Sequence, residues 1–393
     1  VQHVIAMFGA TVLAPILMGF DPNLAIFMSG VGTLLFYFIT GGQVPSYLGS
    51  SFAFIGVVIA ATGYGGQGPN ANLPVALGAI IVCGLLYALI GALVNAVGTR
   101  WIERLMPPVV TGAVVAVIGL NLAAIPVKNM AASNFDSWMQ LATFVSVALV
   151  AVFARGMVQR LLILVGLAIA TLIYVLLANG LGLGKPMDFS GIANAAWVGL
   201  PRFTAPEFSG NAMLLIAPVA LILVAENLGH LKAVAAMTGR NLDPYIGRAF
   251  TADGVATMIS GAAGGTGVTT YAENIGVMAA TRIYSTAVFV VAALMALVLG
   301  FSPKFGALIQ AIPLPVMGGV SIVVFGLITI AGARIWVDNK VDFSNPANLL
   351  TAAITLILGT GDFTLKFGSF ALGGIGTATF GAVLLHALLR RRA

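Results

Sequence analysis

The fold is indicated by one stretch, residues 264–276, which reads Gly-Gly-Thr-Gly-Val-Thr-Thr-Tyr-Ala-Glu-Asn-Ile-Gly. The small, hydroxyl and aromatic residues before Glu273 predict a short extended segment that leads into a half-helix. Glu226, which follows the apolar run 213–225, is a second carboxylate in apolar surroundings. An ionisable group inside a membrane costs about 2.5 kcal/mol or more on insertion scales, so it usually faces a pathway or a ligand. We therefore expect the two glutamates to mark the functional site.

The composition of the whole chain is typical of a membrane protein. The 393 residues are 60% hydrophobic and only 8% charged, whereas soluble domains carry roughly 25% charged residues. A soluble core of this length could not hide so much apolar sequence, so we expect an all-α polytopic protein embedded in the lipid bilayer. The net charge of +6 comes from basic residues scattered through short loops, and a nucleic acid is therefore not an expected partner.

Fourteen apolar segments are predicted, most of them about long enough to span a bilayer as a helix. Segments three and ten are expected to be interrupted by short extended stretches that lead into half-helices. Because the chain begins at Val1, without an initiator Met and at the edge of the first segment, we expect a short N-terminal segment to precede it. The segments are predicted at residues 3–20, 23–39, 46–62, 73–98, 107–127, 138–154, 161–182, 211–230, 246–262, 269–281, 284–301, 307–332, 346–361 and 369–389.

The basic residues predict how these segments are oriented, because Lys and Arg are enriched in cytoplasmic loops. With both termini in the cytoplasm, five of the 18 basic residues fall outside, namely Lys128, Lys185, Arg202, Lys304 and Lys366. The other thirteen fall inside, namely Arg100, Arg104, Arg155, Arg160, Lys232, Arg240, Arg248, Arg282, Arg334, Lys340, Arg390, Arg391 and Arg392. This asymmetry supports an even number of segments.

The two halves of the chain resemble each other. Pro108, Gly112, Gly119 and Leu120 recur 207 residues later, and the pattern at 50–53 recurs 219 residues later at 269–272. Seven segments in each half would place the halves in opposite orientations, because seven is odd. Inverted repeats with interrupted helices in matching positions are typical of secondary transporters, whose substrate site lies near the middle of the membrane.

Several residues are candidates for handling a proton and a ligand. Glu226 and His230 are four residues apart and share a helix face, so together they could hold and pass a proton. His3 opens the first segment, which is the repeat counterpart of the eighth, and we include it as a candidate for proton coupling. Asp253 of the ninth segment is another acid in an apolar segment, but we expect it to cap or brace the interrupted helices and not to contact the ligand. The sequence has no cluster typical of metal ligands, so no cofactor is expected beyond the proton as coupling ion.

The interrupted segments would offer a flat ligand both polar and aromatic contacts. Free backbone amides and helix N-termini attract carbonyl oxygens, and the rings of Phe52 and Tyr271 could stack on a planar molecule. The site lacks a ring of basic side chains, so a strongly anionic substrate is disfavoured. A planar, neutral molecule with N–H donors and carbonyl acceptors fits best, and a nucleobase has this pattern.

The run Glu273-Asn274-Ile275-Gly276, followed by Thr281 and Arg282, resembles the signature of the nucleobase–ascorbate transporter family, also called nucleobase:cation symporter-2. The stretches at 2–3, 49–52 and 225–230 are also similar to that family, and the similarity covers essentially the whole chain. Glu rather than Gln at position 273 resembles the branch of bacterial uracil permeases and of the pyrimidine permease encoded with the pyrimidine-degradation (Rut) pathway.

This resemblance implies proton-coupled uptake of uracil, and of thymine too, by alternating access in the bacterial cytoplasmic (inner) membrane. It implies a core domain at 1–98 and 211–301, a gate domain at 107–182 and 307–389, and a homodimer formed through the gate domain. It also implies that Glu226 accepts ring N–H bonds, that Glu273 lies at the edge of the ligand, and that His3 and His230 tune or relay the proton.

The resemblance further assigns backbone amides at Phe52 and Ala272 to the carbonyl oxygens of the base. Ser51, Asn274, Phe325 and Asp253 are expected to support the site. Three positions depart from the uracil permeases, which often carry Gly at 272, His at 227 and Tyr at 325, where this chain has Ala, Asn and Phe. The first difference is expected to tighten the site, and the other two change its hydrogen bonds.

Three other functions stay open at this point. The same fold could carry xanthine or another purine with protons, or a related scaffold could form an anion transporter or a channel. An intramembrane enzyme is the third alternative, but the sequence has no nucleophile–base pair and no phosphate-binding loop. The chain is therefore expected not to be an enzyme.

Overall fold

The structure is a computed structural model that describes residues 2–65, 68–367 and 370–389. The predictions above also include residues outside these described ranges, namely residues 1, 66–67, 368–369 and 390–392.

The described chain is mainly helical, as predicted. Its first half contains α1 (Gln2–Met18), α2 (Pro22–Ile39), α3 (Ile55–Thr62), α4 (Leu73–Val97), α5 (Arg100–Leu105), α6 (Pro108–Leu122), α7 (Asn134–Phe153), α8 (Met157–Arg160), α9 (Leu162–Val175) and α10 (Ser190–Asn194). Its second half contains α11 (Gly210–Ile216), α12 (Val219–Thr238), α13 (Ile246–Ala263), α14 (Ala272–Thr281), α15 (Ala287–Gly300), α16 (Pro303–Gln310), α17 (Leu314–Asp338), α18 (Pro346–Thr360) and α19 (Gly374–Leu389).

Within the described ranges, seven helical spans are long and apolar enough to cross a membrane. A further pair, α15 and α16, passes this test only together, and its two helices are bent by 84°. Shorter apolar helices are Gln2–Met18, Phe52–Thr62, Pro346–Thr360 and Gly374–Leu389. The seven spans are Pro22–Ile39, Leu73–Val97, Pro108–Lys128, Asn134–Phe153, Leu162–Gly180, Gly210–Thr238 and Leu314–Asp338.

Proline explains two differences between the predicted and the observed helices. The predicted segment 307–332 is divided, because α16 ends at Gln310 and α17 begins only after Pro313. The predicted segment 211–230 is divided at Pro218, and its second part continues to Thr238. Proline lacks an N–H and clashes with the preceding turn, so it interrupts a helix or begins a new one.

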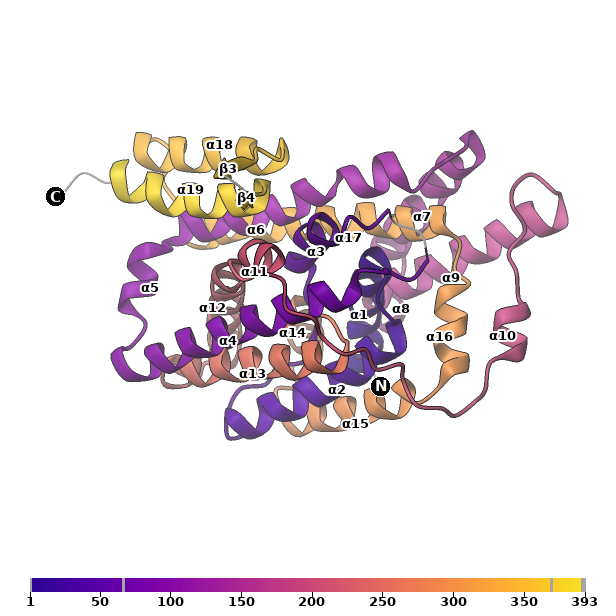
Figure 1. Ribbon diagram of the computed structural model, residues 1–393, viewed down its shortest axis with the longest axis horizontal. Coiled ribbons are helices and arrows are strands. Elements are labelled where there is room, and N and C mark those ends of the chain that lie inside the picture. Colours follow the sequence, from indigo (N-terminus) through magenta and orange to yellow (C-terminus); the bar gives the residue numbers. More distant parts are fainter. Residues whose placement is uncertain (1, 66–67, 368–369, 390–393) are drawn as a thin grey trace.

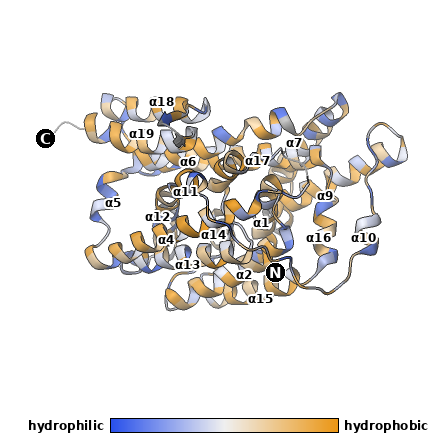
Figure 2. Cartoon of the chain, in the orientation of Figure 1, coloured by the Kyte–Doolittle hydropathy of each residue, from blue (hydrophilic) through white to orange (hydrophobic). Residues whose placement is uncertain are grey.

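The long helices run roughly side by side, and three pairs are in extensive contact: α4 with α13, α2 with α15, and α6 with α17. Close approach depends on glycine, since a Cβ on Gly84 of α4 would lie only 2.7 Å from the carbonyl oxygen of Gly254 on α13. Figure 1 shows α5 and α16 lying across this direction at opposite ends of the molecule. Figure 2 shows hydrophobic residues along the long helices and more hydrophilic residues at α5 and α10.

Two short strands lie where the sequence predicts extended stretches. β1 (Leu48–Ser50) precedes a short 3₁₀ turn (Phe52–Phe54) and α3, and β2 (Val268–Thr270) precedes α14. The strands pair antiparallel, with Leu48 opposite Thr270 and Ser50 opposite Val268. Both are fully buried, so the pairing satisfies backbone groups that have no access to water. A second hairpin, β3 (Leu365–Phe367) with β4 (Phe370–Leu372), precedes α19.

Candidate functional site

The two glutamates lie on neighbouring helices. Glu226 is on α12 and Glu273 is in the first turn of α14, and these two helices contact each other. Their side chains are partly buried, and the two carboxylates are close enough to interact electrostatically. Oε2 of Glu226 is buried and has no hydrogen-bond partner among the described residues. A buried acceptor without a partner is costly, so this oxygen is available to a ligand or a proton.

Each strand of the buried pair leads directly into a half-helix. The Ser51 N–H donates to the Gly267 carbonyl at 2.9 Å, and the Tyr271 N–H donates to the Tyr47 carbonyl at 3.0 Å. The next residues, Phe52 and Ala272, begin the 3₁₀ turn and α14. N–H groups in the first turn of a helix have no acceptor within the helix, and neither of these two has another partner in the described part of the chain. They are therefore free donors.

A buried hydrogen-bond network lies beside Glu226. The Asn227 amide donates to Asp253 Oδ2 at 2.7 Å and to the Tyr87 hydroxyl at 2.9 Å. The Thr270 hydroxyl donates to Asn227 Oδ1 at 3.2 Å, and the same hydroxyl lies 2.9 Å from His230 Nδ1. Asp253 is fully buried, and it too interacts electrostatically with Glu226. The network therefore connects α4, α12, α13 and β2 next to Glu226.

The ring of His230 takes part in this network. Glu226 and His230 are on the same helix, and the hydrogen bond of the His230 ring goes to Thr270 of β2. Tyr87 and Thr270 were not predicted from the sequence as members of the site. A buried tyrosine in an apolar helix and a threonine in a strand each have many ordinary roles, so only their positions in space identify them.

His3 is hydrogen-bonded to Asn274, the residue after the other glutamate. The Asn274 amide nitrogen lies 3.1 Å from His3 Nδ1 and 3.1 Å from the His3 carbonyl oxygen. The His3 ring also packs against Phe289 of α15, with ring centroids 4.5 Å apart. Since Asn274 follows Glu273 directly, the start of α1 is held next to the acidic turn of α14.

The predicted aromatic residues have different environments. The Tyr271 hydroxyl donates to the Ser50 carbonyl at 3.0 Å and accepts from Thr11 at 3.1 Å, so it ties α1 to both strands. The Phe52 ring contacts Phe325 of α17 edge to face, with centroids 6.0 Å apart. Ser51 accepts the N–H of Ala53 and so caps the 3₁₀ turn that carries Phe52. Stacking of Phe52 or Tyr271 on a ligand stays a prediction.

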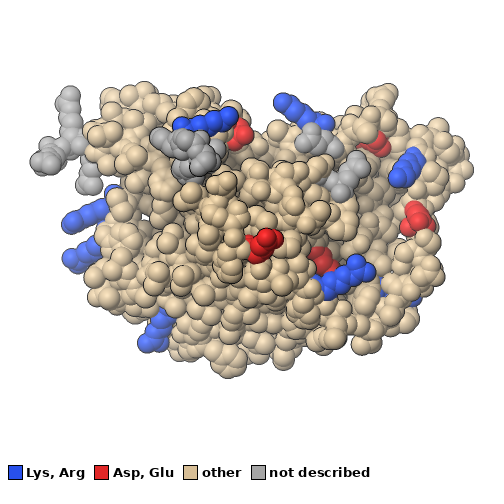
Figure 3. All heavy atoms as spheres, in the orientation of Figure 1, with Lys and Arg blue, Asp and Glu red and all other residues tan. Residues whose placement is uncertain are grey.

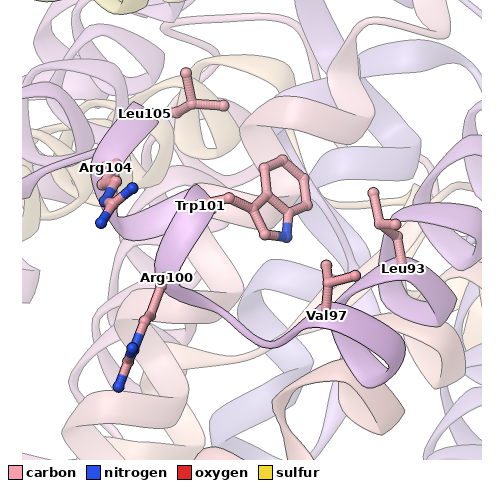
Figure 4. Close-up of a pocket in the computed structure, with 6 residues that line it drawn as sticks. All are labelled: Leu93, Val97, Arg100, Trp101, Arg104 and Leu105. Carbon is pink, nitrogen blue, oxygen red and sulfur yellow. The ribbon is translucent and has the colours of Figure 1, made fainter.

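A surface pocket of about 590 Å³ lies away from this buried site, at the junction of α4 and α5 (Figure 4). Neither Glu226 nor Glu273 lines it. In the described ranges, no group of three or more His, Cys, Asp or Glu side chains could hold a metal ion.

Comparison with known proteins assigns a class to this fold and site. Residues 1–367 match the family described as "Permease family", and the matching relatives are permeases, so the chain is a membrane transport protein and not an enzyme. It belongs to the nucleobase–ascorbate transporter (nucleobase:cation symporter-2) family, as the resemblance of its motifs predicted.

The chain is 70% identical over 392 residues to the "Putative pyrimidine permease RutG" of Escherichia coli (strain K12), covering 100% of this chain and 89% of that protein. It is 42% identical over 394 residues to the "Uracil permease" of Paenibacillus larvae, covering 98% of this chain and 91% of that protein. It is 39% identical over 399 residues to the "Uracil permease" of Escherichia coli (strain K12), covering 99% of this chain and 90% of that protein.

Two transporters are among the solved structures that share the fold. The transmembrane domain of the cyanobacterial bicarbonate transporter BicA superimposes with a TM-score of 0.68 at 16% identity, covering 97% of this chain and 94% of that chain. The murine anion transporter Slc26a9 superimposes with a TM-score of 0.70 at 12% identity, covering 98% of this chain and 67% of that chain. At such low identity, these similarities define the architecture alone.

Proposed function

We propose that this protein takes up uracil, and thymine as a second substrate, together with protons across the cytoplasmic membrane. The observation that carries the proposal is that Glu226 lies on a helix that contacts both half-helix starts with free N–H groups, and that Glu273 lies in the first turn of one of them. Uracil has ring N–H donors and carbonyl acceptors in one plane. Carboxylates would accept from its N–H groups, and the amides of Phe52 and Ala272 would donate to its carbonyl oxygens. The names of the matching relatives support a pyrimidine as cargo.

Glu226 is the proposed carrier of the coupled proton. It has one buried oxygen without a partner in the described structure, and Glu273 and Asp253 are two further acids within electrostatic range. Three ionised carboxylates so close together would repel one another, and protonating one of them relieves this repulsion. The state that holds uracil would therefore also hold one proton. The imidazoles of His230 and His3, which are held by Thr270 and Asn274, would tune or relay this proton.

Movement of two bodies past each other is the proposed transport step. The core would contain residues 1–98 and 211–301, and the gate 107–182 and 307–389. Packing supports this division, because α6 contacts α17, α18 and α19 while α13 contacts α2 and α4. The Phe52–Phe325 contact would then lie between core and gate. We also propose that the chain forms fourteen membrane segments, arranged as two inverted repeats.

Helix pairing supports the inverted repeat. If segments one to seven correspond to segments eight to fourteen, the α4–α13 pair has its counterpart in α2–α15, and α7–α9 has its counterpart in α18–α19. The α5 and α16 helices, which connect the proposed core to the proposed gate, lie at opposite ends of the molecule (Figure 1). Cytoplasmic termini and a homodimer formed through the gate are proposed from the basic-residue pattern and the family.

Thermal unfolding of the purified protein with a panel of bases tests the choice of cargo. A ligand that binds only the folded state raises the apparent stability, by about 2.7 kcal/mol at a concentration one hundred times its Kd. We expect uracil to raise the melting temperature, thymine to raise it less, and xanthine to leave it unchanged. A larger rise with xanthine would favour the purine alternative.

A second candidate is anion transport, which the fold of BicA and Slc26a9 favours. The site argues against it, because two carboxylates at the ligand would repel an anion. Uptake of labelled bicarbonate or chloride by proteoliposomes that do not take up uracil would support this candidate.

A further inference from the structure

The pocket at the junction of α4 and α5 combines two cationic side chains with an apolar surface. We call it the α4–α5 pocket. Figure 4 shows the guanidinium groups of Arg100 and Arg104 on one side and the Trp101 ring, Val97 and Leu93 on the other. Its lining residues are Leu93, Val97, Arg100, Trp101, Arg104 and Leu105.

Both arginines are exposed, and no acidic partner for either is found in the part of the chain that the structure describes. Glu103, the acid between them on α5, pairs with Lys232 at 3.2 Å. A second groove of about 560 Å³ shares Arg100 and Arg104, is also lined by Glu103, and adds Lys340, so basic side chains extend beyond the pocket. That groove also contains Asp342, whose Oδ1 accepts hydrogen bonds from the backbone N–H and hydroxyl of Ser344.

The apolar part of the lining faces outward. Leu93, Val97 and Leu105 are 48%, 61% and 45% exposed, which is the expected state of side chains that face lipid tails. The Trp101 indole N–H is buried and has no hydrogen-bond partner among the described residues. A buried donor of this kind, between cations and apolar side chains, points to a ligand that is both polar and apolar.

The position of α5 suits the surface of a membrane. The helix lies across the direction of the long helices at one end of the molecule (Figure 1), and basic side chains gather over it in Figure 3. Short helices with basic residues on one face and Trp or Leu on the other lie in the interfacial plane of a bilayer. In a bilayer, this position of α5 would place the pocket at the level of the lipid headgroups.

We propose that the α4–α5 pocket binds one anionic phospholipid, such as phosphatidylglycerol, whose phosphate pairs with Arg100 and Arg104. The Trp101 N–H donates to an oxygen of the headgroup or glycerol, and an acyl chain follows Val97 and Leu93. Assignment to the cytoplasmic leaflet rests on the orientation given under the proposed function. A lipid fits better than free phosphate, because half of the lining side chains are aliphatic.

Quenching of Trp101 fluorescence by brominated lipids tests the proposal. The chain carrying W138F, W197F and W336F is reconstituted with a low fraction of brominated phosphatidylglycerol or, separately, brominated phosphatidylcholine. We expect stronger quenching by the anionic lipid, with a preference on the order of fivefold for each arginine. R100Q/R104Q should abolish this preference. The matched control K128Q/R202Q removes the same amount of charge from exposed residues elsewhere, and it should keep the preference for the anionic lipid.

Three results would overturn the proposal: equal quenching by both lipids, a preference that survives R100Q/R104Q, and loss of the preference when millimolar inorganic phosphate is added. The last would assign the pocket to free anions. Native mass spectrometry of the chain with all four tryptophans repeats the comparison by counting retained phosphatidylglycerol, in case the triple variant folds poorly. Neither readout depends on transport, so failure here and failure of uracil uptake are separate outcomes.

Discussion

Thr33 of α2 and Thr257 of α13 hold the two short strands in the same way. The Thr33 hydroxyl accepts from the Leu48 N–H at 2.9 Å and donates to the Leu48 carbonyl at 3.3 Å. The Thr257 hydroxyl accepts from the Val268 N–H at 3.2 Å and donates to the Val268 carbonyl at 3.1 Å. One hydroxyl in each half of the chain thus satisfies both backbone groups of a strand residue that has no water to bond with. The hydrogen bonds of these two hydroxyls hold in place the strands that precede both half-helices.

Removing either hydroxyl should therefore loosen the site. Thr33→Val and Thr257→Val keep the side-chain shape but leave a buried N–H and a buried carbonyl without this partner, which costs about 1–3 kcal/mol. We expect each variant to melt at a lower temperature and to bind uracil more weakly. Thr238→Val is the matched control, because the Thr238 hydroxyl donates only to carbonyls of its own helix. Equal melting temperatures for Thr257→Val and Thr238→Val would show that the Thr257 hydroxyl does not stabilise the strand.

Gly49 should not tolerate a side chain. A Cβ at this position would collide with the ring of Tyr271, whose hydroxyl ties α1 to the strands. Overpacking of this kind costs typically about 1–3 kcal/mol. We predict that Gly49→Ala lowers both the melting temperature and uracil uptake, whereas Gly326→Ala, which meets open space, keeps both near wild type. Similar behaviour of the two variants in a thermal scan would show that the Tyr271 contact is not critical.

Substitutions of Asn227 and Asp253 should have coupled effects on the stability of the protein. Asn227→Leu leaves Asp253 buried without its 2.7 Å donor, at a cost of about 1–3 kcal/mol. Because the two residues share one hydrogen bond, Asn227→Leu/Asp253→Leu should destabilise the protein by less than the sum of the single variants. Denaturation of all four proteins in the same detergent measures the coupling. Strictly additive losses would mean that the bond contributes nothing to stability.

The contact between Phe52 and Phe325 should affect movement more than binding. The rings meet edge to face between helices that we assign to different bodies. Phe325→Ala removes this contact without touching the carboxylates, so we expect uracil to bind within about threefold of wild type while the maximal uptake rate falls at least about tenfold, roughly 1.4 kcal/mol on the barrier. Binding by thermal shift and uptake by radiolabel separate the two. A tenfold loss of affinity with an unchanged maximal rate would place Phe325 in the substrate site instead.

Much of the helical pattern could be predicted from the sequence, because each apolar run of spanning length has few alternatives in a membrane. The segment 73–98 became α4, and the hydroxyl-rich stretches before Phe52 and Ala272 became strands. The predicted segment 307–332 runs through Pro313, because the apolar character continues there, whereas α17 begins only at Leu314. Residues such as Thr33, Tyr87 and Thr257 could not be predicted, because their roles arise from partners 11 to 140 positions away. The hydrogen bond between His230 and Thr270 could not be predicted for the same reason, since the two residues are 40 positions apart.

Uracil uptake into proteoliposomes with an imposed pH gradient tests the central claim most directly. The claim is that Glu226, near Glu273 and Asp253, takes the proton that couples transport to the gradient. We predict that wild-type protein accumulates uracil only when the outside is more acidic, and that accumulation stops when a protonophore is added. Glu226→Gln should keep its fold but lose gradient-driven uptake. Wild-type accumulation in Glu226→Gln, or uptake by the wild type that is indifferent to the gradient, would contradict the account.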